Sequence, residues 1–72
     1  MMDTRLYVKE WNAMYPVGTF VSVTRDDGSV LDTVTESEAW LTGDTPIILV
    51  KGIRGGYMLS RVRVVPMKQV IE

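Results

Sequence analysis

The feature that most constrains this chain is the close spacing of its turn signals after Gly18. Glycine and proline recur through this part of the sequence, and only short runs of β-branched and aliphatic residues lie between them. Such residues pack well on a pleated sheet, and short runs of them bounded by turn residues are typical of strands. We therefore expect most of the chain to form short β-strands around one core.

The clearest turn signal is Asp26-Asp27-Gly28-Ser29. An Asp-Gly pair between two β-rich runs is a strong indication of a tight hairpin, because such turns need positive φ angles. The sequence predicts five strands, with this turn between the first two: Thr19–Arg25, Val30–Val34, Thr45–Val50, Tyr57–Leu59 and Val62–Val64. The third is a continuous apolar run, which suits a central strand buried on both faces.

The N-terminal residues 1–15 form a predicted helix. Asp3 or Thr4 can cap it by accepting hydrogen bonds from backbone N–H groups that lack helical partners. Pro16 ends it, because the residue before a proline is driven out of the α region. Apolar side chains recur at helical spacing and predict one stripe packed on the core: Tyr7, Trp11, Met14 and Tyr15.

A second, shorter helix or helical turn is expected at Glu36–Thr42. Thr35-Glu36-Ser37-Glu38 matches the capping-box pattern, in which the threonine hydroxyl reaches forward and the last glutamate reaches back. Gly43 then stands where a helix would end in a left-handed residue. This element would carry Trp40, either as a lid over one end of the strands or as a partly exposed anchor.

Composition bounds the class of protein. The 72 residues predict a single domain at 1–72, with a helix at 1–15, a β-barrel at 17–66 and a tail at 67–72. The chain has no cysteine for disulfides or thiolate clusters, and a cytoplasmic location is expected. No run approaches the roughly 18 apolar residues of a membrane-spanning helix, so no membrane partner is expected.

An enzymatic role is not expected. The sequence contains no histidine and no cysteine, which removes the commonest general base and the strongest nucleophile. Asp26 and Asp27 are explained by the hairpin turn and lack the spacing of a calcium-binding loop. Gly52–Gly56 lacks the Lys-Ser/Thr pair of a phosphate-binding loop, so a turn is the simpler interpretation. No catalytic residue, cofactor or metal is predicted.

Two resemblances extend these expectations. The segment Gly56–Val64 resembles the end of an SH3-like barrel, in which a glycine-led strand passes through one 3-10 turn into the last strand; Leu59–Val62 would be that turn. The resemblance implies a small five-stranded SH3-like barrel, with the N-terminal helix packed over it. The acidic and aromatic motif with which SH3 domains bind polyproline is missing, so that ligand class is not implied.

A longer stretch resembles a group of short uncharacterised bacterial and phage proteins, often carried in prophages. The likeness rests on these segments: Trp11-Asn12, Tyr15–Thr19, Ser37–Leu41, Thr45–Ile47 and Gly52–Gly56. It implies a bacterial or phage accessory protein that works inside the cell. It implies no activity and no functional residue.

The first functional hypothesis is a non-catalytic protein-interaction module. Its contact surface would include Trp40, Arg54 and Tyr57, because Trp, Tyr and Arg most often dominate the energies of interfaces. Arg54 lies between glycines, which leave it little intrachain packing. A protein partner is therefore the expected ligand.

The alternative hypothesis is a small nucleic-acid-binding barrel. Net charge is −1, but residues 26–44 carry acidic side chains and no lysine or arginine, whereas residues 45–72 carry five lysines and arginines against one acidic residue, Glu72. Lys51, Arg54, Arg61 and Arg63 would either form a basic face that meets a phosphate backbone or pair with acidic strand faces. A homo-oligomer is a third arrangement, because a small barrel leaves edge strands open.

Overall fold

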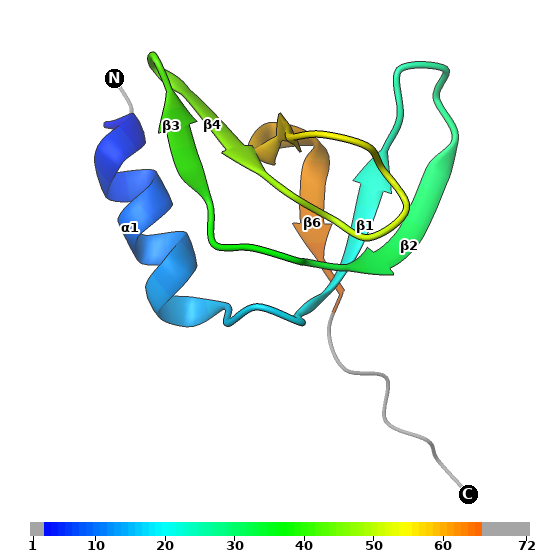
Figure 1. Cartoon of the computed structure of the whole chain (residues 1–72), viewed down its shortest axis with the longest axis horizontal. Coiled ribbons are helices and arrows are strands. Elements are labelled where there is room, and N and C mark those ends of the chain that lie inside the picture. Colours follow the sequence, from blue (N-terminus) through cyan, green and yellow to red (C-terminus); the bar gives the residue numbers. More distant parts are fainter. Residues whose placement is uncertain (1–2, 66–72) are drawn as a thin grey trace, which may run out of the picture.

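The structure is a computed structural model and describes residues 3–65. It contains one helix, six short strands and one 3-10 turn (Figure 1). In chain order these are α1 (Thr4–Met14), β1 (Phe20–Thr24), β2 (Val30–Val34), β3 (Trp40–Thr42), β4 (Thr45–Ile48), β5 (Tyr57–Met58), η1 (Leu59–Arg61) and β6 (Val62–Val64). The predicted mainly β fold with one N-terminal helix is confirmed. Pro66 and the predicted tail lie outside the described residues.

Helix α1 begins where the sequence predicts its cap. The Asp3 Oδ1 atom accepts hydrogen bonds from the backbone N–H groups of Arg5 at 3.0 Å and Leu6 at 3.4 Å. These bonds satisfy two of the donors that have no partner inside the helix. Helix α1 ends at Met14, and Tyr15 is already extended (φ −128°, ψ 100°), as expected for a residue before proline.

The β1–β2 hairpin forms at the predicted turn. The Arg25 N–H donates to the Ser29 carbonyl at 2.8 Å, and the Gly28 N–H donates to the Arg25 carbonyl at 3.0 Å. Gly28 has φ +89°, a conformation that glycine adopts without steric cost. A three-residue loop with a left-handed glycine at its end is a common hairpin connection. The hairpin predicted from the Asp-Gly pair is therefore confirmed.

The strands form two small antiparallel sheets, with the orders β2-β1-β6 and β3-β4-β5. Strand β4 is central in its sheet, as expected for the apolar run Thr45–Val50. The expectation that this run is buried on both faces is wrong, because only one face of β4 meets the core. Ile48 on that face is fully buried, whereas Ile47 on the other face is half-buried and Thr45 is exposed.

The two sheets meet at one corner, beside the buried Thr35. Its backbone forms an isolated antiparallel bridge with Val50, which lies just beyond β4. The Thr35 Oγ1 atom accepts hydrogen bonds from the N–H groups of Gly18 at 3.0 Å and Thr19 at 3.2 Å, and so holds the α1–β1 turn against this corner. The pairing of the described strands thus gives two joined sheets rather than one closed ring.

The predicted helix at Glu36–Thr42 is wrong. Its last residues form β3, which pairs with β4 across a two-residue turn that contains Gly43. Gly43 has φ +62°, which a helix C-terminus and a tight hairpin both favour, so the same signal supports either element. The hydroxyl of Thr35, the predicted cap, instead accepts from the Gly18 and Thr19 N–H groups. The Ser37 hydroxyl accepts a hydrogen bond from the Leu49 N–H at 3.1 Å, which ties this segment to the residue that follows β4.

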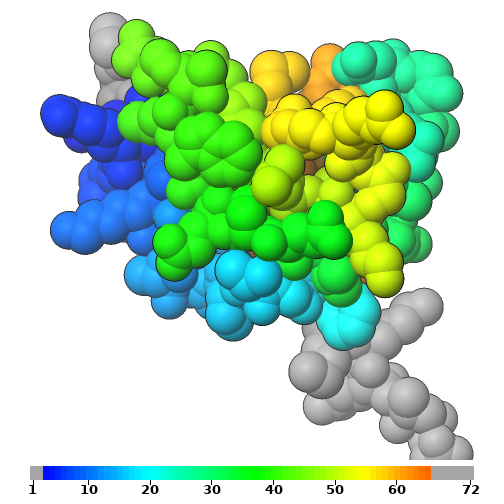
Figure 2. All heavy atoms as spheres, in the orientation of Figure 1, coloured from blue at the N-terminus to red at the C-terminus, as the bar shows by residue number. Residues whose placement is uncertain are grey.

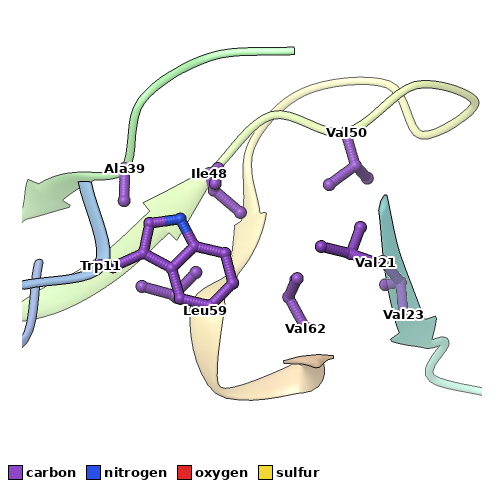
Figure 3. Packing of buried hydrophobic residues seen from close by; sticks show 8 residues of the cluster. All are labelled: Trp11, Val21, Val23, Ala39, Ile48, Val50, Leu59 and Val62. Carbon is purple, nitrogen blue, oxygen red and sulfur yellow. The ribbon is translucent and has the colours of Figure 1, made fainter. Parts of the chain in front are cut away.

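The hydrophobic core lies between the two sheets and against α1 (Figure 3). Its buried side chains are Trp11, Val21, Val23, Ala39, Ile48, Val50, Leu59 and Val62. The Trp11 indole fills the space between the sheets, as its place on the predicted stripe indicates, and the Tyr15 ring lies against it with 4.7 Å between centroids. Met14, expected on the same stripe, is 64% exposed.

Helix α1 also covers the edge of the second sheet next to β3. The Asn12 Nδ2 group donates to the Ala39 carbonyl at 2.9 Å, and the Ala39 N–H donates to Asn12 Oδ1 at 2.8 Å. The side-chain amide therefore takes the place of a neighbouring strand at Ala39. This pair of hydrogen bonds fixes how the helix lies on the sheet.

Candidate partner-binding surface

An apolar row crosses the outer face of the β3-β4-β5 sheet. The strand register places Trp40 opposite Ile47 and Ile47 opposite Met58. Directly opposed residues in a sheet point to the same face, so these three side chains lie side by side. Trp40 is 39% exposed and Met58 is 40% exposed, and Ile47 between them is half-buried. We call these three residues the apolar row.

Gly56 provides the surface on which the Trp40 ring lies. A Cβ atom at position 56 would lie 3.4 Å from the Cη2 and Cζ2 atoms of Trp40 and would overlap the Cγ2 atom of Ile47. Because glycine has no side chain, the indole can approach the backbone and cover it. An aromatic ring over a glycine is a recognised way to protect a sheet at such a position. Trp40 is therefore held against the sheet with part of its ring in solvent.

Arg54 lies in the loop between β4 and β5, two residues before Gly56. Its side chain is exposed, and no ion pair involves it within residues 3–65. The loop itself is anchored, because Ile53 packs against the core and a Cβ atom at Gly52 would touch Leu31 at 3.4 Å. Figure 2 shows this loop (yellow) and the β3–β4 segment (green) side by side on the face in view. A charged side chain on an anchored loop is suited to contact a partner.

Tyr57 lies on the opposite face of the sheet from Trp40. It pairs with the buried Ile48 and packs against the core. Its hydroxyl lies 3.1 Å from the Thr24 carbonyl and 3.4 Å from Asp26 Oδ1, and so joins β5 to the β1–β2 hairpin. The structure thus separates Tyr57 from Trp40, although the two were predicted on one surface, and its contacts stabilise the fold.

The acidic turn of the hairpin is occupied by contacts within the chain. Asp26 Oδ1 lies 3.6 Å from an Arg61 guanidinium nitrogen. Asp27 Oδ1 accepts hydrogen bonds from the Ser29 hydroxyl at 2.7 Å and from the Ser29 N–H at 2.9 Å. These two bonds, the hydroxyl foremost, lower the pKa of Asp27. Both carboxylates thus have structural roles in the turn.

The four basic residues of the nucleic-acid hypothesis lie on three different elements. Lys51 and Arg54 are exposed in the β4–β5 loop, Arg61 is in η1 and pairs with Asp26, and Arg63 is exposed on β6 opposite Ser22. The loop packs on the core-facing side of β2, whereas Arg63 alternates with inward-facing valines and projects from the outer face. The structure does not gather these four side chains into one row.

A metal-binding cluster is not assembled in the described part of the chain. Within residues 3–65 there is no cluster of acidic side chains that could hold a metal ion. The same residues contain no helix that is both long and apolar enough to cross a bilayer.

Comparison of this chain with known proteins identified no similar protein. No protein family, no curated protein and no solved structure matches the chain. The candidate surface thus depends on geometry alone.

Of the residues in this candidate surface, Trp40 and Arg54 are predicted from the sequence, and the remaining three are not. Ile47, Gly56 and Met58 join Trp40 only through strand register, which depends on where the β3–β4 turn lies. A hairpin centred on Gly43 would have revealed the Trp40–Ile47 pair, since one turn position fixes the register of both strands.

Proposed function

We propose that this protein is a non-catalytic protein-interaction module that binds a protein partner through the apolar row, with Arg54 at its margin. The observation that supports this most is the placement of Trp40, whose ring is held over Gly56 yet remains 39% exposed. A rigid, partly exposed tryptophan beside an unpaired arginine has the composition of an interface hot spot. Few side chains need ordering on binding, which favours affinity.

We further propose that the two joined sheets are an SH3-like barrel. The 3-10 turn Leu59–Arg61 between β5 and β6 and the Thr35–Val50 bridge between the sheets support this. In an SH3-like barrel the last strand pairs with the first, as β6 does with β1 here. The ligand would not be a polyproline segment, because the required acidic and aromatic motif is missing from the sequence.

The resemblance to bacterial and phage proteins supports an accessory role inside a bacterial cell. Some of the residues that carry it have structural roles in this chain: Trp11 fills the core, Asn12 pairs with Ala39, and Gly18 donates to Thr35. Others belong to the candidate surface: Trp40, Ile47, Arg54 and Gly56. On the basis of the resemblance we place the protein in the cytoplasm, and its partner among host or phage proteins.

The test replaces apolar row residues with a polar β-former of similar branching. A Trp40→Thr/Met58→Thr double variant, and a triple variant that adds Arg54→Ser, are compared with Phe20→Thr. Phe20 is 60% exposed on the other sheet and is thus a matched control. Partner capture from bacterial lysate should fall at least tenfold in the row variants and stay unchanged in the control. Capture that survives the row substitutions, or that falls equally with Phe20→Thr, would overturn the proposed surface.

A further inference from the structure

A groove separates α1 from strand β6, on the side of the molecule away from the β1–β2 hairpin. Its volume is about 460 Å³, within the range of about 300–1,000 Å³ that binding pockets usually have. It is lined by Tyr7, Glu10, Trp11 and Met14 of the helix, by Tyr15 directly after it, and by Val62, Arg63 and Val64 of the strand. The groove is therefore large enough for one or two side chains and has aromatic rings on one wall.

The other wall of the groove is the free edge of β6. Among the described strands, β6 pairs only with β1. Successive side chains of a strand point to opposite faces of its sheet. All three residues of β6 nevertheless line the groove. The groove therefore reaches both faces of the strand, which means that it runs along the edge of β6.

The hydrogen-bond pattern shows which backbone groups of β6 point into this space. The Val65 N–H donates to the Phe20 carbonyl at 3.1 Å, so Val65 belongs to a hydrogen-bonded pair with β1. Antiparallel strands alternate between bonded and non-bonded pairs. Val64, which opposes Val21, is thus in a non-bonded pair and directs its N–H and C=O away from β1. An additional strand would find a donor and an acceptor at this residue.

Within the described part of the chain, helix α1 lies beside two sheet edges, those of β3 and β6, but forms hydrogen bonds to the backbone at only one of them. At the β3 edge, Asn12 satisfies both backbone groups of Ala39. At the β6 edge, the helix residues that face the strand are aromatic or apolar apart from Glu10, and residues 3–65 provide no backbone hydrogen bond to Val64 from that side. An edge left open beside an apolar wall can accept a strand from another molecule.

We propose that this groove binds an extended peptide segment of a protein partner, which adds to β6 as a fourth strand of the β2-β1-β6 sheet. One apolar side chain of the peptide enters the groove against Trp11 and the neighbouring tyrosines. Glu10 and Arg63 lie on opposite walls, and neither forms an ion pair within the described residues. The peptide therefore carries a basic residue that reaches Glu10 and an acidic residue that reaches Arg63. This site is separate from the apolar row.

The probe is a displayed library of random octapeptides, selected on the full chain. The enriched sequence is then synthesised in two forms, one unmodified and one with N-methyl groups on alternate residues that face β6. We expect enrichment of an apolar residue flanked by a basic and an acidic residue, and at least tenfold weaker binding of the N-methylated form. Hydrogen exchange at the Val64 amide should slow at least tenfold on addition of the unmodified peptide.

Two variants of the protein complete the test. Val64→Pro removes the N–H that points into the groove and leaves the hydrogen bonds to β1, whereas Glu10→Lys reverses one charge on an exposed helix position. Val64→Pro should abolish binding, and Glu10→Lys should weaken it at least fivefold and shift selection toward acidic peptides. If Val64→Pro does not fold, the N-methylated peptide tests the reciprocal hydrogen bond, from the peptide N–H to the Val64 carbonyl, on the unaltered protein.

Several results would overturn the proposal. These are a selection that enriches no octapeptide, binding that N-methylation leaves unchanged, and peptide-induced shifts confined to the apolar row. Slow exchange of the Val64 amide without peptide would also overturn it: dependence on protein concentration would identify a second copy as the occupant, and independence would identify the chain itself. Loss of the apolar row by Trp40→Thr should leave peptide binding intact, which separates this site from the proposed function.

Discussion

The amide of Asn12 offers the sharpest test of how α1 is held on the sheet. Asn12→Ala removes both hydrogen bonds to Ala39, which are 2.9 and 2.8 Å long and partly buried. A buried donor or acceptor left without a partner costs about 1–3 kcal/mol. These groups are only partly buried, so we take about 1–2 kcal/mol for each, and the loss of two predicts a decrease of about 2–4 kcal/mol in the free energy of unfolding. A domain of this size has a total of only about 4–10 kcal/mol.

Asn12→Asp separates the hydrogen bonds from side-chain shape. At neutral pH the carboxylate still accepts from the Ala39 N–H but faces the Ala39 carbonyl with a second oxygen, which is repulsive. The folded state therefore favours the protonated acid, and the pKa of Asp at this position should rise above its usual value of about 3.9. The variant should gain stability relative to Asn12→Ala as pH falls, and lose it as pH rises through the raised pKa.

Urea unfolding followed by the fluorescence of buried Trp11 measures both effects. With a slope near 1 kcal/mol/M for a small domain, Asn12→Ala should lower the midpoint by about 2–4 M. A change below about 0.5 kcal/mol, the usual range for surface substitutions, would refute the role of the amide pair. So would an Asp variant whose stability relative to Asn12→Ala does not depend on pH.

Three further predictions follow from the sheet and the hairpin. Gly56→Ala should lower the free energy of unfolding by about 1–3 kcal/mol, because the new Cβ atom overlaps Ile47. In urea unfolding, the Gly56→Ala/Ile47→Ala double variant should lose less stability than the two single variants together. Losses that add up in full would contradict the close approach of Gly56 to Ile47. Ser29→Ala should raise the lowered pKa of Asp27 toward 3.8, as followed by NMR titration, so that the stability which Asp27 gives above that pH and loses on acidification is reduced; an unmoved pKa would contradict the assigned cause. A mobility-shift titration at low salt should show no complex of the protein with nucleic acid. Complex formation that decreases steeply with salt would instead support the nucleic-acid-binding alternative.

The elements that sequence predicted well are those set by local chemistry. Asp3 determines where α1 begins through its hydrogen bonds to the backbone, and Pro16 determines where it ends through steric restriction of Tyr15. Gly28 determines the position of the hairpin turn through its positive φ. The 3-10 turn at Leu59–Arg61 is likewise local, and the resemblance to SH3-like ends indicated it within one residue. Each of these features depends on residues close together in the chain.

The prediction of a helix at Glu36–Thr42 failed because the same local sequence signal is compatible with a helix end and with a hairpin turn. Gly43 favours a positive φ, which ends helices and also closes tight hairpins, and Thr35 with Glu38 matched a capping box by composition alone. What decided the outcome was the pairing of Trp40–Thr42 with β4 in a tight hairpin, the second of the two structures that Gly43 permits. Tertiary pairing thus overrode the helix signal.

The candidate surface could be predicted only in part for the same reason. Alternation along β5 shows that Tyr57 and Met58 face opposite sides, but sequence cannot say which side meets the core until the register with β4 is known. Tyr57 was therefore placed with Trp40, whereas Met58 takes that position. The groove beside β6 depends on how α1 lies over the sheets, which Asn12 and Ala39 set from distant parts of the chain.

The proposed function requires that the outer face of the β3-β4-β5 sheet contacts the partner. The most direct measurement is a two-dimensional NMR titration of the labelled protein with its captured partner, read at backbone amides and at the Trp40 indole N–H. We expect the largest shifts at Trp40, Ile47, Gly56 and Met58, with Arg54 at the margin. Shifts that cluster around Phe20 on the other sheet, with an unchanged Trp40 indole, would contradict the claim.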